Sequence, residues 1–146
     1  MNRENREAPV AGVDRQSGPA GNTNTVVAGT DAGTLPAELA RATGLAADRK
    51  ANDLLVLDLR GISNATDYFF LASGTSDMHV RSIAEHIIEE LKKEGVRAAH
   101  VEGLRSGRWV LLDYIDFVVH VFHPAAREFY QLERLWGDAP AYAIEA

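Results

Sequence analysis

The stretch that most constrains the fold of this chain is Trp109–His123, which reads WVLLDYIDFVVHVFH. It contains two apolar runs, Trp109–Leu112 and Phe117–Phe122, separated by a break at residues 113–116. Short runs rich in Val, Phe and Trp around a polar break are typical of two adjacent antiparallel strands. The second run is apolar at almost every position except His120, so both of its faces should meet protein. We therefore predict a central pair of strands rather than a solvated edge.

A helix is expected to follow this strand pair. Pro124 suits the first turn of a helix, and Phe129, Leu132 and Trp136 are spaced by three and four residues. The spacing predicts a strand, strand, helix unit that closes the domain.

Three more strands are predicted upstream. Leu54–Leu59 is an apolar run interrupted only by Asp58, as in strands that are buried on both faces. Tyr68–Ala72 is rich in aromatic residues and follows a cluster of turn formers at Ser63–Asp67. Arg97–Glu102 is more polar, so we expect it nearer an edge of the sheet.

Two helices are predicted among these strands. The first begins near Thr34, where Pro36 and Glu38 are typical of a helix start. The second is ended by two lysines and Gly95. Its apolar positions repeat every three and four residues: Val80, Ile83, Ala84, Ile87, Ile88 and Leu91.

This order of elements predicts a single α/β domain with a mixed five-stranded sheet flanked by helices on both sides, a nucleotidyltransferase-like topology. We place the domain at residues 34–137. Residues 1–33 are rich in Gly, Asn, Thr and charge and have few large aliphatic side chains, so we expect a disordered tail. Residues 138–146 are expected to form a C-terminal tail.

Composition excludes several classes of protein. The net charge is −6 and no stretch collects five or six basic residues, so a broad surface for nucleic acid is not expected and a basic protein partner fits better. With no cysteine, disulfides and thiolate chemistry are excluded. No run of eighteen apolar residues and no apolar signal core is present, so we expect a soluble cytoplasmic protein that does not contact a membrane.

One motif suggests an enzyme. Gly74-Thr75-Ser76 lies between a predicted strand and a predicted helix, where backbone amides can bind a phosphate, and it resembles the glycine-serine turn of nucleotidyltransferases. Such enzymes also need two carboxylates on alternate positions of one strand to hold metal ions. Asp58 stands alone and Asp113 and Asp116 are three apart, so this pair is missing. A metal-dependent nucleotidyl or phosphoryl transferase is thus the alternative, and a plain helix cap is the simpler interpretation.

The histidines do not suggest a metal site. His120 and His123 point to opposite faces if both lie on one strand, whereas zinc needs three or four converging ligands. We expect no metal and no cofactor, and we interpret His120 as a core histidine satisfied by hydrogen bonds.

Aromatic and acidic residues gather on and around the third and fourth strands: Glu102, Trp109, Asp113, Tyr114 and Asp116. Tryptophan and tyrosine are frequent anchors of protein interfaces, and neighbouring carboxylates attract arginine or lysine of a partner. From the residues alone, Trp109 is equally well explained as part of the core.

Several blocks in this order resemble the ribosomal silencing factor family, RsfS, also called Iojap-like. They are DLLVLDL, TDYFFLASGTS, HVRSIAEHIIEELKKEG and GRWVLLDYIDFVVHVFH, followed by REFYQLERLW, within Asp53–Trp136. The resemblance implies a small α/β protein without catalysis that binds a ribosomal protein on the joining face of the large subunit and blocks small-subunit docking. It also implies a homodimer, and it favours Trp109 as an interface residue.

One departure from the family concerns the break between the central strands. The family usually has glycine between tyrosine and aspartate, where this chain has Ile115. A β-branched residue is unfavourable at positive φ, so either the turn differs in type or the loop is shifted.

Overall fold

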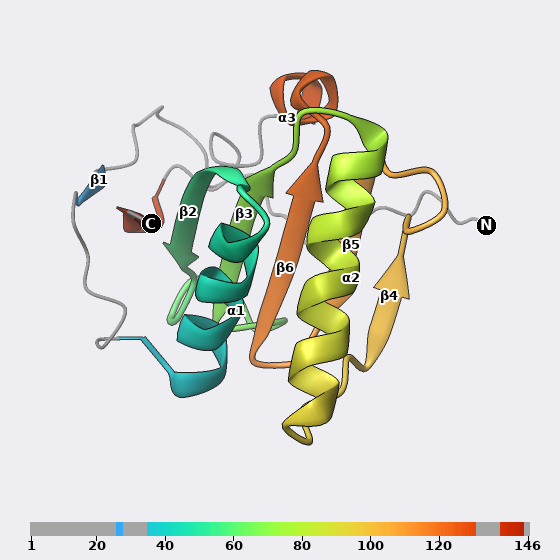
Figure 1. Ribbon diagram of the computed structural model, residues 1–146. Helices are drawn as coiled ribbons and strands as arrows, with labels where there is room; N and C mark the ends of the chain where they lie inside the picture. The colour runs from blue at the N-terminus through green and yellow to red at the C-terminus, as the bar shows by residue number, and fades with distance from the viewer. Residues whose placement is uncertain (1–25, 28–34, 131–137, 145–146) are drawn as a thin grey trace.

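The computed structural model of the chain describes residues 26–27, 35–130 and 138–144. Its elements, in chain order, are β1 (Val26–Val27), α1 (Ala37–Asp48), β2 (Asn52–Asp58), β3 (Tyr68–Ser73), α2 (Asp77–Lys93), β4 (His100–Glu102), β5 (Trp109–Asp113), β6 (Phe117–Phe122), α3 (Pro124–Tyr130) and β7 (Ala141–Ala143). They form one mixed sheet in the order β1-β7-β2-β3-β6-β5-β4 (Figure 1).

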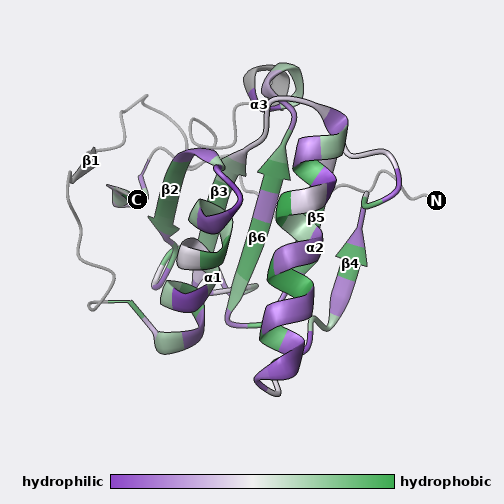
Figure 2. Cartoon of the chain, viewed as in Figure 1, coloured by the Kyte–Doolittle hydropathy of each residue, from purple (hydrophilic) through white to green (hydrophobic). Residues whose placement is uncertain are grey.

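Both strands of the predicted pair lie inside this sheet, with β5 next to the edge strand β4. β6 pairs in parallel with β3 and antiparallel with β5, and all six of its residues are buried. It is hydrophobic along most of its length (Figure 2). A strand that is hydrogen-bonded on both edges and covered on both faces needs apolar residues at nearly every position, which explains why its sequence does not alternate.

Helices α1 and α2 lie side by side on one face of the sheet (Figure 1). The buried residues of α2 are Val80, Ile83, Ala84, Ile87 and Leu91, which form one stripe along the helix. They belong to a core cluster that also includes Leu39 of α1 and Phe70 of β3. The helical spacing in the sequence therefore selects the face that α2 turns to the sheet.

The opposite face of the sheet has its own apolar cluster. It includes Leu57, Phe69 and Phe122 from three neighbouring strands, together with Ala126 of α3. Helical residues thus reach both faces, and the predicted single α/β domain with a mixed sheet is confirmed. The remainder of the helix expected through Trp136 lies outside the described residues.

The sheet has more strands than the five predicted, because two segments outside the predicted domain contribute to it. Ala141–Ala143, expected as part of a C-terminal tail, forms β7 and pairs antiparallel with β2. Val26–Val27 forms β1 and pairs in parallel with β7. Most of the tail predicted at residues 1–33 lies outside the described residues. In the part of the chain that the structure describes, no helix is long and apolar enough to span a membrane.

The turn between β5 and β6 places Ile115 at φ 74°, the region that β-branched side chains avoid. The amide of Asp116 donates to the carbonyl of Tyr114 at 2.9 Å, which gives a three-residue turn of the rare type with positive φ at its centre. Two side chains hold this conformation: Asp113 Oδ1 accepts from the Ile115 amide at 2.8 Å, and Thr66 Oγ1 donates to the Ile115 carbonyl at 2.9 Å. The turn is therefore of a special type, and Ile115 adopts the positive φ that the sequence argument disfavoured.

Candidate functional site

Three of the five predicted partner-binding residues lie on one face of the sheet, at the β4 edge. Glu102 pairs with Leu111 across β4 and β5, so their side chains point to the same side. Trp109 and Asp113 are two positions before and after Leu111 on β5 and share that side as well. We call Glu102, Trp109 and Asp113 the β4–β5 face. It is the side of the sheet opposite to α1 and α2, and all three residues are partly exposed.

Trp109 is neither fully core nor fully surface. Its indole stacks on Phe122 with ring centroids 5.2 Å apart, and it packs against the second apolar cluster. Its Nε1 donates a hydrogen bond to Nδ1 of His120 at 3.0 Å. One edge of the ring is therefore fixed from within the protein, while the side chain remains partly exposed.

His120 is the buried support of Trp109. It is fully buried, and its ring lies edge-on to Phe69 at 4.5 Å between centroids and stacks with Phe122. Because Nδ1 accepts the hydrogen bond from the indole N–H, the proton of the neutral imidazole lies on Nε2. Nε2 has no hydrogen-bond partner among the described residues. Desolvation lowers the pKa of His120 to about 3, so the ring is neutral near neutral pH.

His120 is a core histidine, as expected, although among the described residues only one of its two ring nitrogens has a hydrogen-bond partner. Its hydrogen bond with Trp109 is a contact that the sequence did not reveal. Trp109 is opposite Phe122 and Leu111 is opposite His120, so the contact is a diagonal one that depends on the strand register. The sequence locates the break between the two strands, but it does not show which of their residues are paired.

The other two predicted residues do not join the β4–β5 face. Tyr114 is 8% exposed, stacks on Phe117 at 5.1 Å, and belongs to the cluster under α1 and α2. Burial raises the pKa of its hydroxyl to about 12. Asp116 is exposed, but it lies in the turn beyond Tyr114. The odd separation between Trp109 and Tyr114 was a signal in the sequence that they would point to opposite faces.

The carboxylates of the β4–β5 face are also organised. Glu102 is bonded to His100, whose position on β4 is opposite Asp113. Asp113 is about 13 Å along the strand from Trp109, since a strand advances about 3.3 Å per residue. The face therefore presents an aromatic ring and two separated carboxylates, an arrangement suited to a partner that carries arginine or lysine around an apolar contact.

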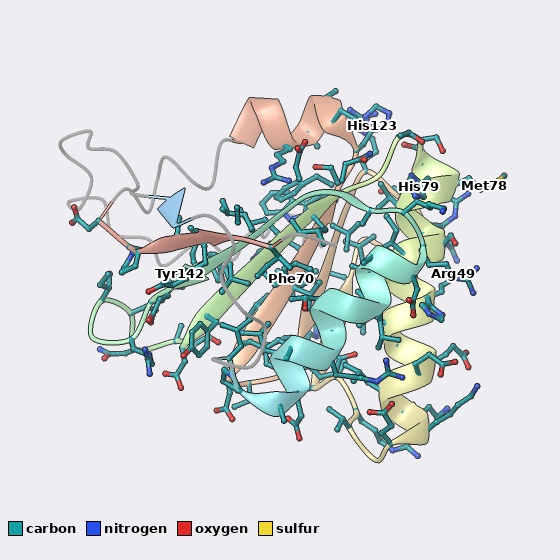
Figure 3. All side chains as sticks on the ribbon, turned by 60° about the vertical axis from the view of Figure 1, so that its left-hand side comes forward. Arg49, Phe70, Met78, His79, His123 and Tyr142 are labelled. Carbon is teal, nitrogen blue, oxygen red and sulfur yellow. The ribbon has the colours of Figure 1, made fainter. Side chains whose placement is uncertain are left out.

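The Gly74-Thr75-Ser76 turn is the N-terminal cap of α2. Ser76 Oγ accepts from the His79 amide at 3.0 Å, and the Thr75 amide donates to Nδ1 of His79 at 2.8 Å. The Gly74 amide donates to the carbonyl of Phe122 at 2.9 Å. His79 lies between this turn and Arg49, whose carbonyl is 2.7 Å from its Nε2 (Figure 3). These three amides already have partners within the protein, which agrees with the interpretation of the turn as a helix cap.

Metal-binding geometry is not seen in the described residues either. No group of three or more His, Asp or Glu side chains is placed to hold an ion there. Asp58 forms an ion pair with Arg60 at 2.8 Å, and the hydrogen bonds from that guanidinium lower the pKa of the carboxyl. His123 lies just beyond β6, where its Nδ1 accepts from the Ala125 amide at 3.2 Å. The transferase alternative thus gains no support.

Comparisons with known proteins identify the family. A family model described as "Ribosomal silencing factor during starvation" matches residues 33–146. This chain belongs to the ribosomal silencing factor family. It is 47% identical over 93 residues to the ribosomal silencing factor RsfS of Bacillus subtilis, a match that covers 64% of this chain and 79% of the relative.

A more distant relative and a solved structure extend this assignment. The chain is 32% identical over 89 residues to "Mitochondrial assembly of ribosomal large subunit protein 1" of Mus musculus, covering 59% of this chain and 39% of the mouse protein. It also resembles a crystal structure of a Chromobacterium violaceum protein, with a TM-score of 0.68 and 36% identity over 69% of this chain and 84% of the other. The family resemblance in the sequence is confirmed, and the name of the mouse relative refers to assembly of the large ribosomal subunit.

Proposed function

We propose that this chain silences translation by binding alone, without catalysis. The β4–β5 face attaches to a basic ribosomal protein on the joining face of the large subunit in the cytoplasm, and the bulk of the domain then prevents association with the small subunit. The observation that carries this proposal is the partly exposed Trp109, held by His120 and accompanied by Glu102 and Asp113 on the same face.

The physical basis is an aromatic anchor surrounded by negative charge. An indole buries a large area at little cost in rotamer freedom, and it is already fixed by its hydrogen bond to His120. Carboxylates on the same face steer a basic partner and set its orientation. We propose that Asp116 adds to this field from the β5–β6 turn, and that Tyr114 supports the turn from inside the core.

Sedimentation with purified subunits tests the proposal. The protein should travel with free large subunits, bind small subunits far less, and lower the yield of joined ribosomes. Because the attraction is between carboxylates here and cations on the partner, rising salt should weaken it. Equal binding to both subunits, or binding to the large subunit that leaves joining unaffected, would contradict the proposal.

Trp109→Ala tests the anchor. It should weaken binding to large subunits by roughly 2 kcal/mol or more, as loss of a hot-spot aromatic does, while the protein remains folded because the ring is only partly buried. The matched control is Ile62→Ala, which removes another exposed apolar side chain, in the loop between β2 and β3, and should bind like the parent. A folded Trp109→Ala variant with parental affinity would remove Trp109 from the interface.

Asp113→Asn tests the charge at the same face. An amide oxygen can still accept from the Ile115 amide, so the turn should be retained while one negative charge is lost. We expect slower association with little loss of stability. The homodimer implied by the family resemblance stays a prediction, which sedimentation equilibrium of the free protein will check.

A further inference from the structure

A short loop between β4 and β5 differs in charge from the rest of this acidic protein. Residues 103–108 read GLRSGR and contain no acidic residue. Arg105 and Arg108 are exposed, and the side chain of Arg81, on α2, reaches under the loop. We call residues 103–108, together with Arg81 beneath them, the arginine loop.

The charges of the arginine loop are not neutralised by carboxylates. The guanidinium of Arg81 donates to the carbonyls of Arg105 and Ser106 at 3.1 and 3.5 Å. None of the three arginines takes part in an ion pair among the described residues. Asp77 lies one helical turn before Arg81, but the two side chains do not form an ion pair in that part of the chain.

Two other cations of the described chain are paired with carboxylates. Arg41 is bonded to Glu94 at 2.8 Å and Lys93 to Glu90 at 3.0 Å. The arginine loop is therefore a local concentration of free positive charge on a molecule of net charge −6.

The loop backbone is fixed before any partner arrives. Gly103 and Gly107 have φ of 80° and 73°, and the Gly107 amide donates to the carbonyl of Gly103 at 3.1 Å. A Cβ on Gly107 would lie 2.5 Å from the carbonyl oxygen of Asp77, so the loop lies directly against the first turn of α2. Little conformational entropy would be lost when this loop binds.

The position of the loop indicates its partner. Arg108 directly precedes Trp109 and Gly103 directly follows Glu102, so the arginine loop lies at the end of β4 and β5 that carries Trp109 and Glu102, next to the first turn of α2. We propose that, while the β4–β5 face holds a ribosomal protein, the arginine loop binds the phosphate backbone of the adjacent ribosomal RNA. The guanidinium fork matches phosphate oxygens, and the surface of a ribosomal subunit presents both protein and RNA.

This inference rests on the proposed function and adds a second kind of contact to it. The two exposed arginines provide contacts to two phosphates, which fits a local clamp rather than the broad nucleic-acid surface that the composition argues against. Free RNA alone should bind weakly at physiological salt, because it lacks the protein partner.

The test compares Arg105→Gln/Arg108→Gln with Lys92→Gln/Arg97→Gln. Both double variants remove two exposed positive charges, but the second does so at the far end of α2 and before β4. Binding to purified large subunits is measured over a range of salt concentrations. The bound subunits are then probed with hydroxyl radicals, which report protection of the RNA backbone.

We expect the arginine-loop variant to bind about tenfold more weakly, with a salt slope about 1.5 shallower, since each phosphate contact contributes about 0.7 to 0.9. At saturation it should also lose part of the backbone protection that the parent gives, whereas the control should retain it. Weaker binding with the RNA protection intact would indicate an acidic protein at the loop and overturn the inference. Parental affinity in the arginine-loop variant would do the same. If the parent itself fails to bind large subunits, the proposed function fails first.

Discussion

Replacing His120 by phenylalanine should reduce the loss of stability of this protein between pH 7 and pH 5. The imidazole is fully buried between Phe69 and Phe122 and accepts a hydrogen bond from Trp109. A proton added to it would place a charge in an apolar cluster and would break the bond from the indole. Phenylalanine fills a similar space without a titrating group.

The magnitude follows from the pKa of His120, which is about 3 in the folded protein against an ordinary value of 6.5. A lowered pKa means that the unfolded chain binds the proton more readily, so the free energy of unfolding decreases as the pH falls below about 6.5, down to about 3. Over the interval from pH 7 to pH 5 the unfolded state gains about 2 kcal/mol from this one group.

Urea unfolding followed by circular dichroism at pH 7 and pH 5 measures this loss. The parent should lose about 2 kcal/mol more than His120→Phe does over that interval. Ile83→Val, which trims a buried side chain of the other cluster without a titrating group, should lower stability at both pH values by about 1 kcal/mol and keep the parental pH dependence. If His120→Phe keeps the full pH dependence of the parent, the imidazole is not held neutral by burial and our account of the Trp109 support is wrong.

Three substitutions test the backbone. Gly44→Ala should raise the free energy of unfolding by about 1 kcal/mol in thermal melts, because residue 44 lies within α1 and a Cβ there meets nothing within 4 Å; a lower melting temperature would refute this. At position 115, φ 74° should reverse the usual order of stability, so that Ile115→Gly is about 1 kcal/mol more stable than Ile115→Ala; equal stabilities would show that the turn relaxes. Gly103→Ala should lower the free energy of unfolding by roughly 3 kcal/mol or more, because its Cβ would lie 2.0 Å from the carbonyl oxygen of Trp109. Gly95→Ala has open space around it and should lower that free energy by only about 1 to 2 kcal/mol, because of its positive φ. Similar losses at the two sites would contradict the clash.

Local physics explains which features the sequence alone determined. The extents of β5 and β6 follow from two apolar runs around a polar break, and the buried stripe of α2 follows from helical periodicity. Ser76 was recognisable as a helix cap because a hydroxyl before a helix accepts a free amide of the first turn. Each of these depends on interactions within a few residues along the chain.

Only the tertiary structure decided how these pieces meet. β7 is three residues long and has no strand pattern of its own, so it exists because β2 offers it a free edge. The contact between Trp109 and His120 requires the register of β5 against β6. The arginine loop exists because Gly107 brings the loop against α2 and so places Arg81 beneath it. Pairing between distant segments is set by the packing of the whole sheet, and a sequence read in short windows does not contain it.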